Sequence, residues 1–199
     1  MSIYQYDSSF REQGFEAIAG IDEAGRGPLA GPVVASAVVL PEALRIKGLR
    51  DSKKVPERER ETLFWDILAL SLGVGIGIVY HYDIDRMNIL NATRLAMKIA
   101  LEDLYFRPSL LIIDAVTLPV VNIRQISPFK AESLSASVAA ASIVAKYTRD
   151  RLMMHYHECY PQYNFRKHKG YGTTEHIYML SMFGPCPIHR RSFKRVVSQ

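Results

Sequence analysis

Short apolar runs alternate along this chain with segments in which apolar residues recur at helical spacing. Apolar or alternating runs bounded by Gly, Pro or Asp indicate strands. Such runs cover residues 17–21, 33–40, 72–80, 110–114 and 120–130. Amphipathic or small-residue segments between and after them predict helices. These helices cover residues 56–70, 85–105, 133–160 and 173–183.

The first two predicted strands flank a turn rich in Gly and Pro within residues 17–40. Asp22 and Glu23 stand where the first strand ends, followed by Gly25-Arg26-Gly27. A carboxylate at the end of a buried strand is costly unless a positive charge lies against it. That charge is either a bound metal ion or Arg26, in which case an Asp22–Arg26 ion pair merely closes a hairpin.

The strand predicted at residues 110–114 repeats this arrangement. Four aliphatic residues, typical of a buried strand, end in Asp114. Two buried strands that each deliver an acid at the carboxyl end are expected as neighbours in a central sheet. Because hard divalent cations bind carboxylate oxygens, the sequence predicts a metal site at this edge.

Two further segments carry polar groups with two interpretations each. Asp51 or Ser52 can cap the helix that Pro56 begins, and Ser52 with Lys53 beside a helix N-terminus could hold a phosphate. A cap with surface lysines is the alternative. Glu132 stands at the head of the predicted helix 133–160, where the helix dipole alone favours a carboxylate.

Two patterns that suggest other cofactors are rejected. The glycines of residues 72–80 lie inside a strand and open no helix, so they form no dinucleotide-binding loop. His155, His157 and Cys159 are two residues apart on a predicted helix and point to different faces, which argues against zinc.

Composition narrows the class of protein. The 199 residues are 48% hydrophobic and 23% charged, as in a globular protein of one domain with at most a small appendage. The polar N-terminus and short apolar runs predict neither a signal peptide nor a membrane span. Two cysteines form no disulfide framework, so reduced thiols and a cytoplasmic location are expected.

The net charge of +5 is distributed unevenly along the chain. Residues 161–199 carry a net charge of +6, and the first 160 residues carry −1. A basic segment with interspersed aromatic residues is a candidate contact surface for a phosphate backbone. A solvated basic face without a partner is the alternative.

Several motifs together resemble bacterial type 2 ribonuclease H, the ribonuclease HII family. They occur in the family's order and are IDEAGRG at 21–27, DSKK at 51–54, NIL at 88–90, Asp114, AASIVAK at 140–146, TRDR at 148–151 and HKGY at 168–171. The resemblance implies a ribonuclease-H-like α/β fold, a mixed sheet flanked by helices. It also implies a catalytic core at residues 1–160 and a small basic helical part at residues 161–199, packed on the core as one unit.

The resemblance also implies the activity. Family members hydrolyse the RNA strand of RNA–DNA hybrids and cut beside ribonucleotides embedded in duplex DNA, leaving 5′-phosphate and 3′-hydroxyl ends. The expected partner is nucleic acid and the expected cofactor is Mg²⁺ or Mn²⁺, as two ions when substrate is bound. A monomer that does not bind membranes is expected. A DNA-cutting nuclease and a non-catalytic hybrid-binding module are the alternatives.

By resemblance, the catalytic metal ligands are four carboxylates, of which Asp22, Glu23 and Asp114 match the family's first three. The fourth position, usually Asp, is Glu132 here, one methylene longer, and Asp150 is its rival. Adjacent strand residues point to opposite faces, so Asp22 and Glu23 cannot both chelate by side chain from a regular strand. Either the glycines that follow break the regularity of the strand, or Glu23 contributes partly through its backbone.

The remaining predicted site residues bind substrate, and they are Gly25, Arg26, Gly27, Ser52, Lys53, Lys146 and Tyr171. A 2′-hydroxyl is the local chemical difference between an embedded ribonucleotide and DNA. Tyr171 offers a hydrogen-bonding group and a flat face for a sugar, and flanking glycines allow close approach. The glycines around Arg26 let backbone N–H groups approach from the other side. A tyrosine buried in the C-terminal part is the alternative for Tyr171.

Overall fold

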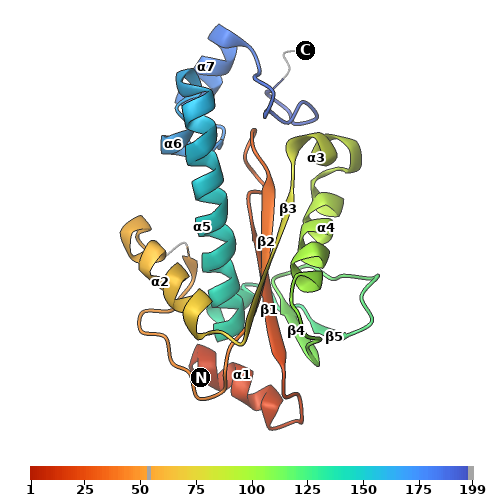
Figure 1. Ribbon diagram of the computed structural model, residues 1–199. Helices are drawn as coiled ribbons and strands as arrows, with labels where there is room; N and C mark the ends of the chain where they lie inside the picture. The colour runs from red at the N-terminus through yellow and green to blue at the C-terminus, as the bar shows by residue number, and fades with distance from the viewer. Residues whose placement is uncertain (53–54, 197–199) are drawn as a thin grey trace.

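A computed structural model describes residues 1–52 and 55–196, and it contains a five-stranded mixed sheet (Figure 1). The strand order is β3-β2-β1-β4-β5. The strands are β1 (Ile18–Ala24), β2 (Val33–Val39), β3 (Gly73–Val79), β4 (Leu110–Ile113) and β5 (Arg124–Ile126). β2 pairs antiparallel with both β1 and β3, whereas β4 pairs parallel with both β1 and β5.

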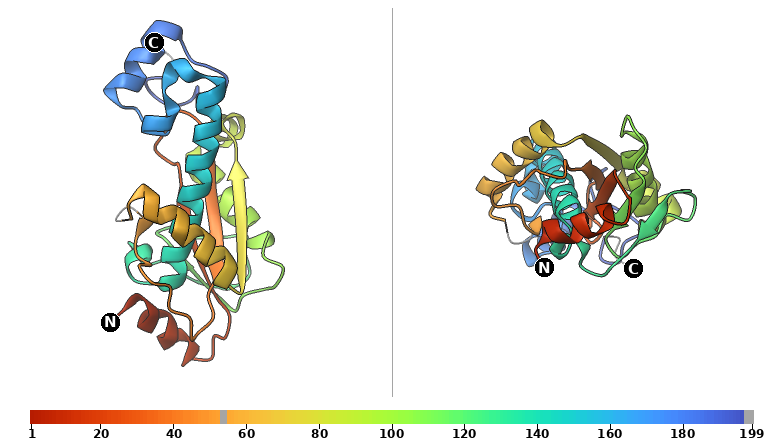
Figure 2. Two further views of the ribbon diagram at one scale, coloured as in Figure 1. Left: turned by 60° about the vertical axis from the view of Figure 1, so that its left-hand side comes forward. Right: turned by 90° about the horizontal axis from the view of Figure 1, so that it is seen from below.

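Helices cover both faces of this sheet. They are α1 (Ile3–Arg11), α2 (Glu57–Leu70), α3 (His81–Met87), α4 (Ile89–Glu102), α5 (Ala136–Cys159), α6 (Phe165–His168) and α7 (Thr174–Phe183), with short 3₁₀ turns η2 (Ala131–Ser133) and η3 (Pro161–Tyr163). α5 and α2 cover one face and α4 the other (Figure 2). The structure confirms the expected fold class, a mixed sheet flanked by helices.

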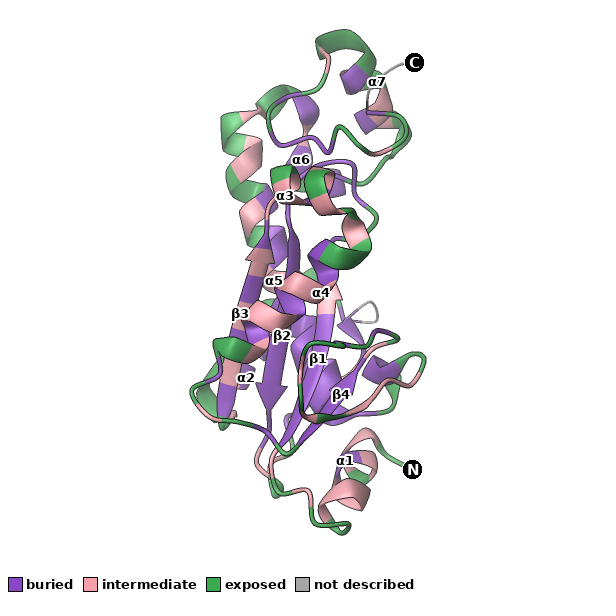
Figure 3. Ribbon diagram, turned by 90° about the vertical axis from the view of Figure 1, so that its right-hand side faces the viewer, coloured by how far each residue is buried: buried purple, intermediate pink, exposed green. Residues whose placement is uncertain are grey.

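The alternation of side chains along β1 fixes which helix lies on which face. Ala19 and Ile21 pack with α4, whereas Gly20 faces α5, where a Cβ would collide with the backbone of Ser137. All seven residues of β2 are buried, because the strand is covered on both faces (Figure 3). This explains its unbroken run of Val, Ala and Ser.

α5 connects the sheet to the C-terminal part. Ser135 caps its first turn by accepting a hydrogen bond from Val138 N, and small buried residues let the helix lie close to β1 and β2. Its far end extends beyond the sheet, where α6 and α7 pack around it (Figure 1). The core there joins residues from distant parts of the chain, namely Leu29, Ala30, Met153, Tyr163, Phe165, Leu180, Cys186, Ile188 and Val196.

Three local expectations are wrong. Pro56 is the N-cap of α2 and no side chain caps that helix, because Ser52 bonds Ser142 of α5 instead. The helix predicted at 85–105 is two helices, α3 and α4, which meet at Asn88, whose φ of 70° ends the first and whose side chain caps the second. Glu132 lies in η2, separated from α5, and does not begin the long helix.

The described part of the chain contains no helix long and apolar enough to cross a membrane.

Candidate active site

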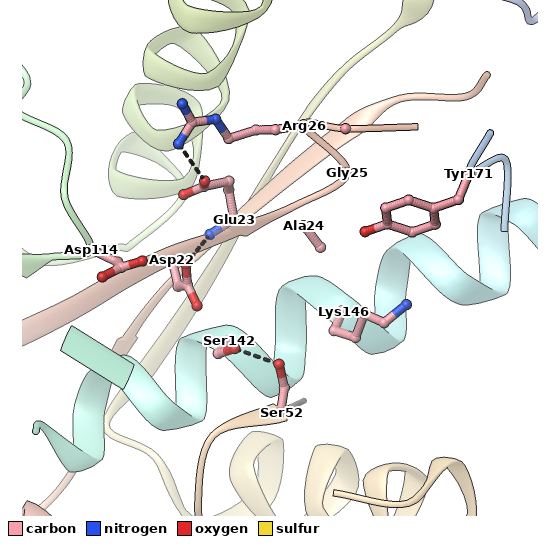
Figure 4. A pocket seen from close by; sticks show the side chains of 11 residues that line it. Asp22, Glu23, Ala24, Gly25, Arg26, Ser52, Asp114, Ser142, Lys146 and Tyr171 are labelled. Carbon is pink, nitrogen blue, oxygen red and sulfur yellow. Dashed lines mark hydrogen bonds and ion pairs between the residues drawn. The ribbon is translucent and has the colours of Figure 1, made fainter. Parts of the chain in front are cut away.

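A cleft opens at the carboxyl end of β1 (Figure 4). It is lined by residues from β1 and the loop after it, from the segment before α2, from the segment after β4, from α5 and from the segment after α6. These residues are Asp22, Glu23, Ala24, Gly25, Arg26, Gly27, Ser52, Asp114, Ser142, Lys146 and Tyr171. The cleft forms here because β4 ends at Ile113, opposite Ile21, while β1 continues to Ala24.

Asp22 and Asp114 lie side by side at the bottom of this cleft. Their preceding residues, Ile21 and Ile113, are partners in the parallel ladder, and Asp114 N donates to Ile21 O at 3.2 Å. The pKa of the buried Asp22 is raised well above its usual value by burial and by the charges of Glu23 and Asp114. The hydrogen bond from Glu23 N to Asp22 Oδ1, at 2.7 Å, and the nearby Ser142 hydroxyl oppose the shift in the pKa without cancelling it.

Glu23 reaches the cleft from the opposite face of β1. The strand stays regular through Ala24, so Asp22 points toward α5 and Glu23 toward α4 (Figure 4). Glu23 Oε1 pairs with Arg26 Nη1 at 3.2 Å. The alternative Asp22–Arg26 ion pair is therefore wrong, because the regular strand turns Asp22 to the other face.

Glu132 is buried close to Asp114 but does not line the cleft. Asp114 Oδ1 accepts a hydrogen bond from Ala131 N at 2.8 Å, and this bond ties η2 to the end of β4. Asp150, the rival, lies outside the cleft and pairs with Arg60 at 3.3 Å and Lys146 at 2.5 Å.

The donor set has the chemistry of a hard-cation site. Across residues 1–52 and 55–196, no three His, Cys, Asp or Glu side chains are already arranged to hold a metal ion. Asp22, Glu23 and Asp114 nevertheless line one cleft, where burial and then repulsion from the other two carboxylates raise the pKa of Asp22. A divalent cation with oxygen ligands would relieve this repulsion, so the residues fit such an ion.

The predicted substrate-binding residues that the structure describes line the same cleft; Lys53 lies outside the described residues. Burial lowers the pKa of Lys146 against the opposing effect of Asp150. Tyr171 is 45% exposed and turns its hydroxyl toward the cleft (Figure 4). The alternative interpretation of Tyr171, a tyrosine buried in the C-terminal part, is therefore wrong.

Sequence reasoning missed Ser142, which lines the cleft and bonds Ser52 Oγ at 2.6 Å. The sequence feature that could have identified Ser142 is a hydroxyl side chain within the small-residue stretch of α5, which packs on the sheet. The basic C-terminal segment stays a candidate phosphate-contact surface, because five of its seven Lys and Arg residues are exposed. Lys169 and Arg190 are instead buried and bond protein groups: Lys169 Nζ donates to Arg166 O, whereas Arg190 donates to carbonyls of the loop after β1.

Comparison with known proteins decides the family. The family model described as Ribonuclease HII matches residues 19–196. The chain belongs to the ribonuclease HII family. A ribonuclease HII of Acetivibrio thermocellus is 53% identical over 190 residues, covering 96% of this chain and 74% of that protein. A ribonuclease HII of Bacillus subtilis is 49% identical over 198 residues, covering 100% and 77%.

Solved structures agree with this assignment. The ribonuclease H2 of Pyrococcus horikoshii superposes with a TM-score of 0.75 at 26% identity, covering 90% of this chain and 95% of that one. An Archaeoglobus fulgidus RNase HII, solved in complex with PCNA, gives a TM-score of 0.72 at 26% identity, covering 92% and 96%. As a member of the ribonuclease HII family, the protein is an endoribonuclease that acts on the RNA of RNA–DNA hybrids.

Proposed function

We propose that the cleft at the end of β1 is the active site, where the side chains of Asp22, Asp114 and Glu132, together with Glu23 through its backbone, hold two divalent cations, Mg²⁺ or Mn²⁺. The enzyme also cuts beside single ribonucleotides embedded in duplex DNA, leaving 5′-phosphate and 3′-hydroxyl ends. Bound cations would supply activation of a water molecule and stabilisation of the leaving 3′-oxygen.

One observation carries this proposal: two carboxylates from separate strands meet in ladder register at the bottom of an open cleft. Burying Asp22 beside Asp114 and Glu23 destabilises its ionised form, as the raised pKa of Asp22 indicates. Proteins retain such an arrangement where a cation is bound. The hydrogen bond from Glu23 N to Asp22 Oδ1, at 2.7 Å, holds the Asp22 carboxylate in place.

The substrate strand would lie along the residues on the open side of the cleft. Arg26 and Lys146 supply positive charge for phosphates. The Tyr171 hydroxyl faces the cleft and can bond a 2′-hydroxyl, with its ring against the sugar. Since phosphates are the same in RNA and DNA, this contact would identify the ribonucleotide.

The proposal extends to the organisation of the protein. Residues 1–160 form the catalytic core, and residues 161–199 form a C-terminal part that acts with it as one unit. The shared apolar core of Leu29, Met153 and Phe165 supports this arrangement. A monomer in the cytoplasm is proposed, in keeping with two free thiols.

Asp114→Asn tests the metal assignment. The amide keeps the size of the side chain and can still accept from Ala131 N, so the fold should persist. Cleavage should fall by about a thousandfold or more, because a ligand that stabilises developing charge is lost. Glu158→Gln, on the exposed end of α5, is the control and should cleave normally. Cleavage by Asp114→Asn near the wild-type rate would contradict the assignment.

A further inference from the structure

Two arginines are almost completely buried beside the loop that follows β1. Arg149 of α5 is 1% exposed and Arg190, near the C-terminus, is 0% exposed. Within the part of the chain that the structure describes, neither forms an ion pair, and every hydrogen bond that they donate goes to a main-chain carbonyl. Burying a charge in this way is costly, so the arrangement requires a reason beyond packing.

Arg190 binds three carbonyls of one loop. Its Nη2 donates to Gly25 O at 2.6 Å, its Nη1 to Arg26 O at 3.1 Å and its Nε to Gly31 O at 2.9 Å. The planar guanidinium offers these donors in a fixed fork, which the single ammonium of a lysine cannot reproduce. Arg190 thereby fixes both ends of the loop at residues 25–31.

Arg149 holds the same loop from the side of α5. Its Nε donates to Pro32 O at 3.0 Å, its Nη2 to Ala30 O at 3.1 Å, and its Nη1 to Lys169 O at 3.0 Å. Gly25 has a φ of +101°, and a Cβ there would collide with Arg149 Nε. The glycine is therefore required both by the backbone conformation and by the close approach of this guanidinium.

The carbonyl contacts determine where the loop N–H groups point. In a trans peptide unit, the C=O and the following N–H point in opposite directions, and the described chain contains no cis bond. With Gly25 O and Arg26 O directed at the buried Arg190, the N–H groups of Arg26 and Gly27 point away from it. Both residues are exposed and line the cleft, and within the described residues neither N–H has a hydrogen-bond partner.

Two consecutive outward N–H groups form a concavity that binds an anionic oxygen. Burial and the charge of Arg149 lower the pKa of Arg190 to about 9, and burial lowers that of Arg149 to about 10. Both remain protonated at neutral pH, so two positive charges lie behind this concavity. Their field favours a phosphate on the open side of the loop.

We infer that Arg190 and Arg149 are positioning residues, which hold the loop at residues 25–31 so that the N–H groups of Arg26 and Gly27 face a substrate phosphate. The inference rests on the proposed function, because that function places the nucleic acid in this cleft. A purely structural role would affect the stability of the fold but leave the activity of folded molecules unchanged.

Arg190→Lys separates these roles, since lysine keeps the charge but loses the fork. The variant is assayed on a DNA duplex with one ribonucleotide, well below its unfolding temperature. We expect kcat/KM to fall at least tenfold. Ile67→Ala, which removes buried side-chain atoms of α2 far from the loop, is the stability-matched control and should keep kcat/KM within twofold. An Arg190→Lys value within twofold of wild type would overturn the inference.

A second measurement decides the case if Arg190→Lys fails to fold. In Asp114→Asn protein labelled with ¹⁵N, the amide signals of Arg26 and Gly27 are followed while the same duplex is added with Mg²⁺. Both signals should shift, and the Gly14 signal, near the opposite end of the molecule, should stay in place. Binding without a shift at Arg26 and Gly27 overturns the inference. Wild-type cleavage that persists with a chelator would instead contradict the proposed function.

Discussion

At the scale of single residues, the site depends on where carboxylates fall relative to strand ends. Asp22 and Asp114 follow buried apolar runs that the sequence marks clearly, so their meeting at one edge of the sheet could be predicted. Glu23 lies on the other face of β1, and its pairing with Arg26 depends on a regular strand end that no sequence pattern specified.

Glu132 and Asp150 can be distinguished by a pair of substitutions. Glu132 is tied to Asp114 through the hydrogen bond at Ala131, whereas Asp150 is held by ion pairs with Arg60 and Lys146. Glu132→Gln should therefore reduce cleavage at least a hundredfold with little loss of stability, because a metal ligand is removed.

Asp150→Asn provides the comparison. It should mainly lower the free energy of unfolding, by about 1–3 kcal/mol, because Arg60 loses its mostly buried partner. Steady-state cleavage and urea unfolding of both variants check this ranking. The opposite ranking would indicate that Asp150 of α5, and not Glu132 of η2, is the fourth metal ligand.

Arg190 shows where sequence reasoning stops. In the sequence it is one of seven basic residues in residues 161–199, which together resemble a solvated or phosphate-binding face. In the fold it is fully buried against a loop more than 150 positions earlier. Only a tertiary contact over that separation distinguishes a buried guanidinium from a surface charge, and no local pattern encodes it.

At the scale of elements, the C-terminal part is organised around histidines. Tyr171 O can only accept, so His176 Nδ1 donates to it at 2.9 Å. His176 Nε2 therefore accepts from His189 Nε2 at 2.9 Å, and His189 Nδ1 accepts from Cys186 N at 3.0 Å. Both histidines are neutral in this chain of hydrogen bonds, and neither can gain a proton without breaking a bond. The network links the segment that carries Tyr171 to the core of this part.

These histidines predict a loss of stability in acid. Burial lowers the pKa of His176 and of His189 to about 4, against about 6.5 in an unfolded chain. Between these values the unfolded state binds more protons, so the free energy of unfolding should fall as pH drops from about 6.5 to about 4. Urea unfolding at pH 7 and pH 5 measures this difference.

A matched pair of variants isolates the histidine contribution from that of the carboxylates. His189→Gln should lower stability at pH 7 but show a smaller further loss at pH 5 than the wild type. His155→Gln, at an exposed position of α5, should leave the pH difference unchanged. An unchanged pH difference in His189→Gln would show that the buried histidine does not cause the acid sensitivity.

At the scale of the whole molecule, α5 connects the two halves of the site. Its first half packs on β1 and contributes Ser142 and Lys146, and its far end lies among the elements of the C-terminal part (Figure 1). The sequence predicted the long helix but placed Glu132 at its head, because the turn at Leu134 separating η2 from α5 leaves no compositional signal. The division at residue 160 stays a prediction.

At the same scale, the proposed function requires that this cleft uses divalent cations to hydrolyse a strand where a ribonucleotide is present. The most direct measurement compares cleavage of three duplexes of one sequence: RNA–DNA hybrid, DNA with one ribonucleotide, and DNA alone. Each is assayed with Mg²⁺ or Mn²⁺ and with excess chelator. We expect cleavage of the first two duplexes with metal, and no cleavage of DNA alone or of any duplex with chelator. Cutting of the all-DNA duplex at a comparable rate, or cleavage that survives the chelator, would contradict the proposed function.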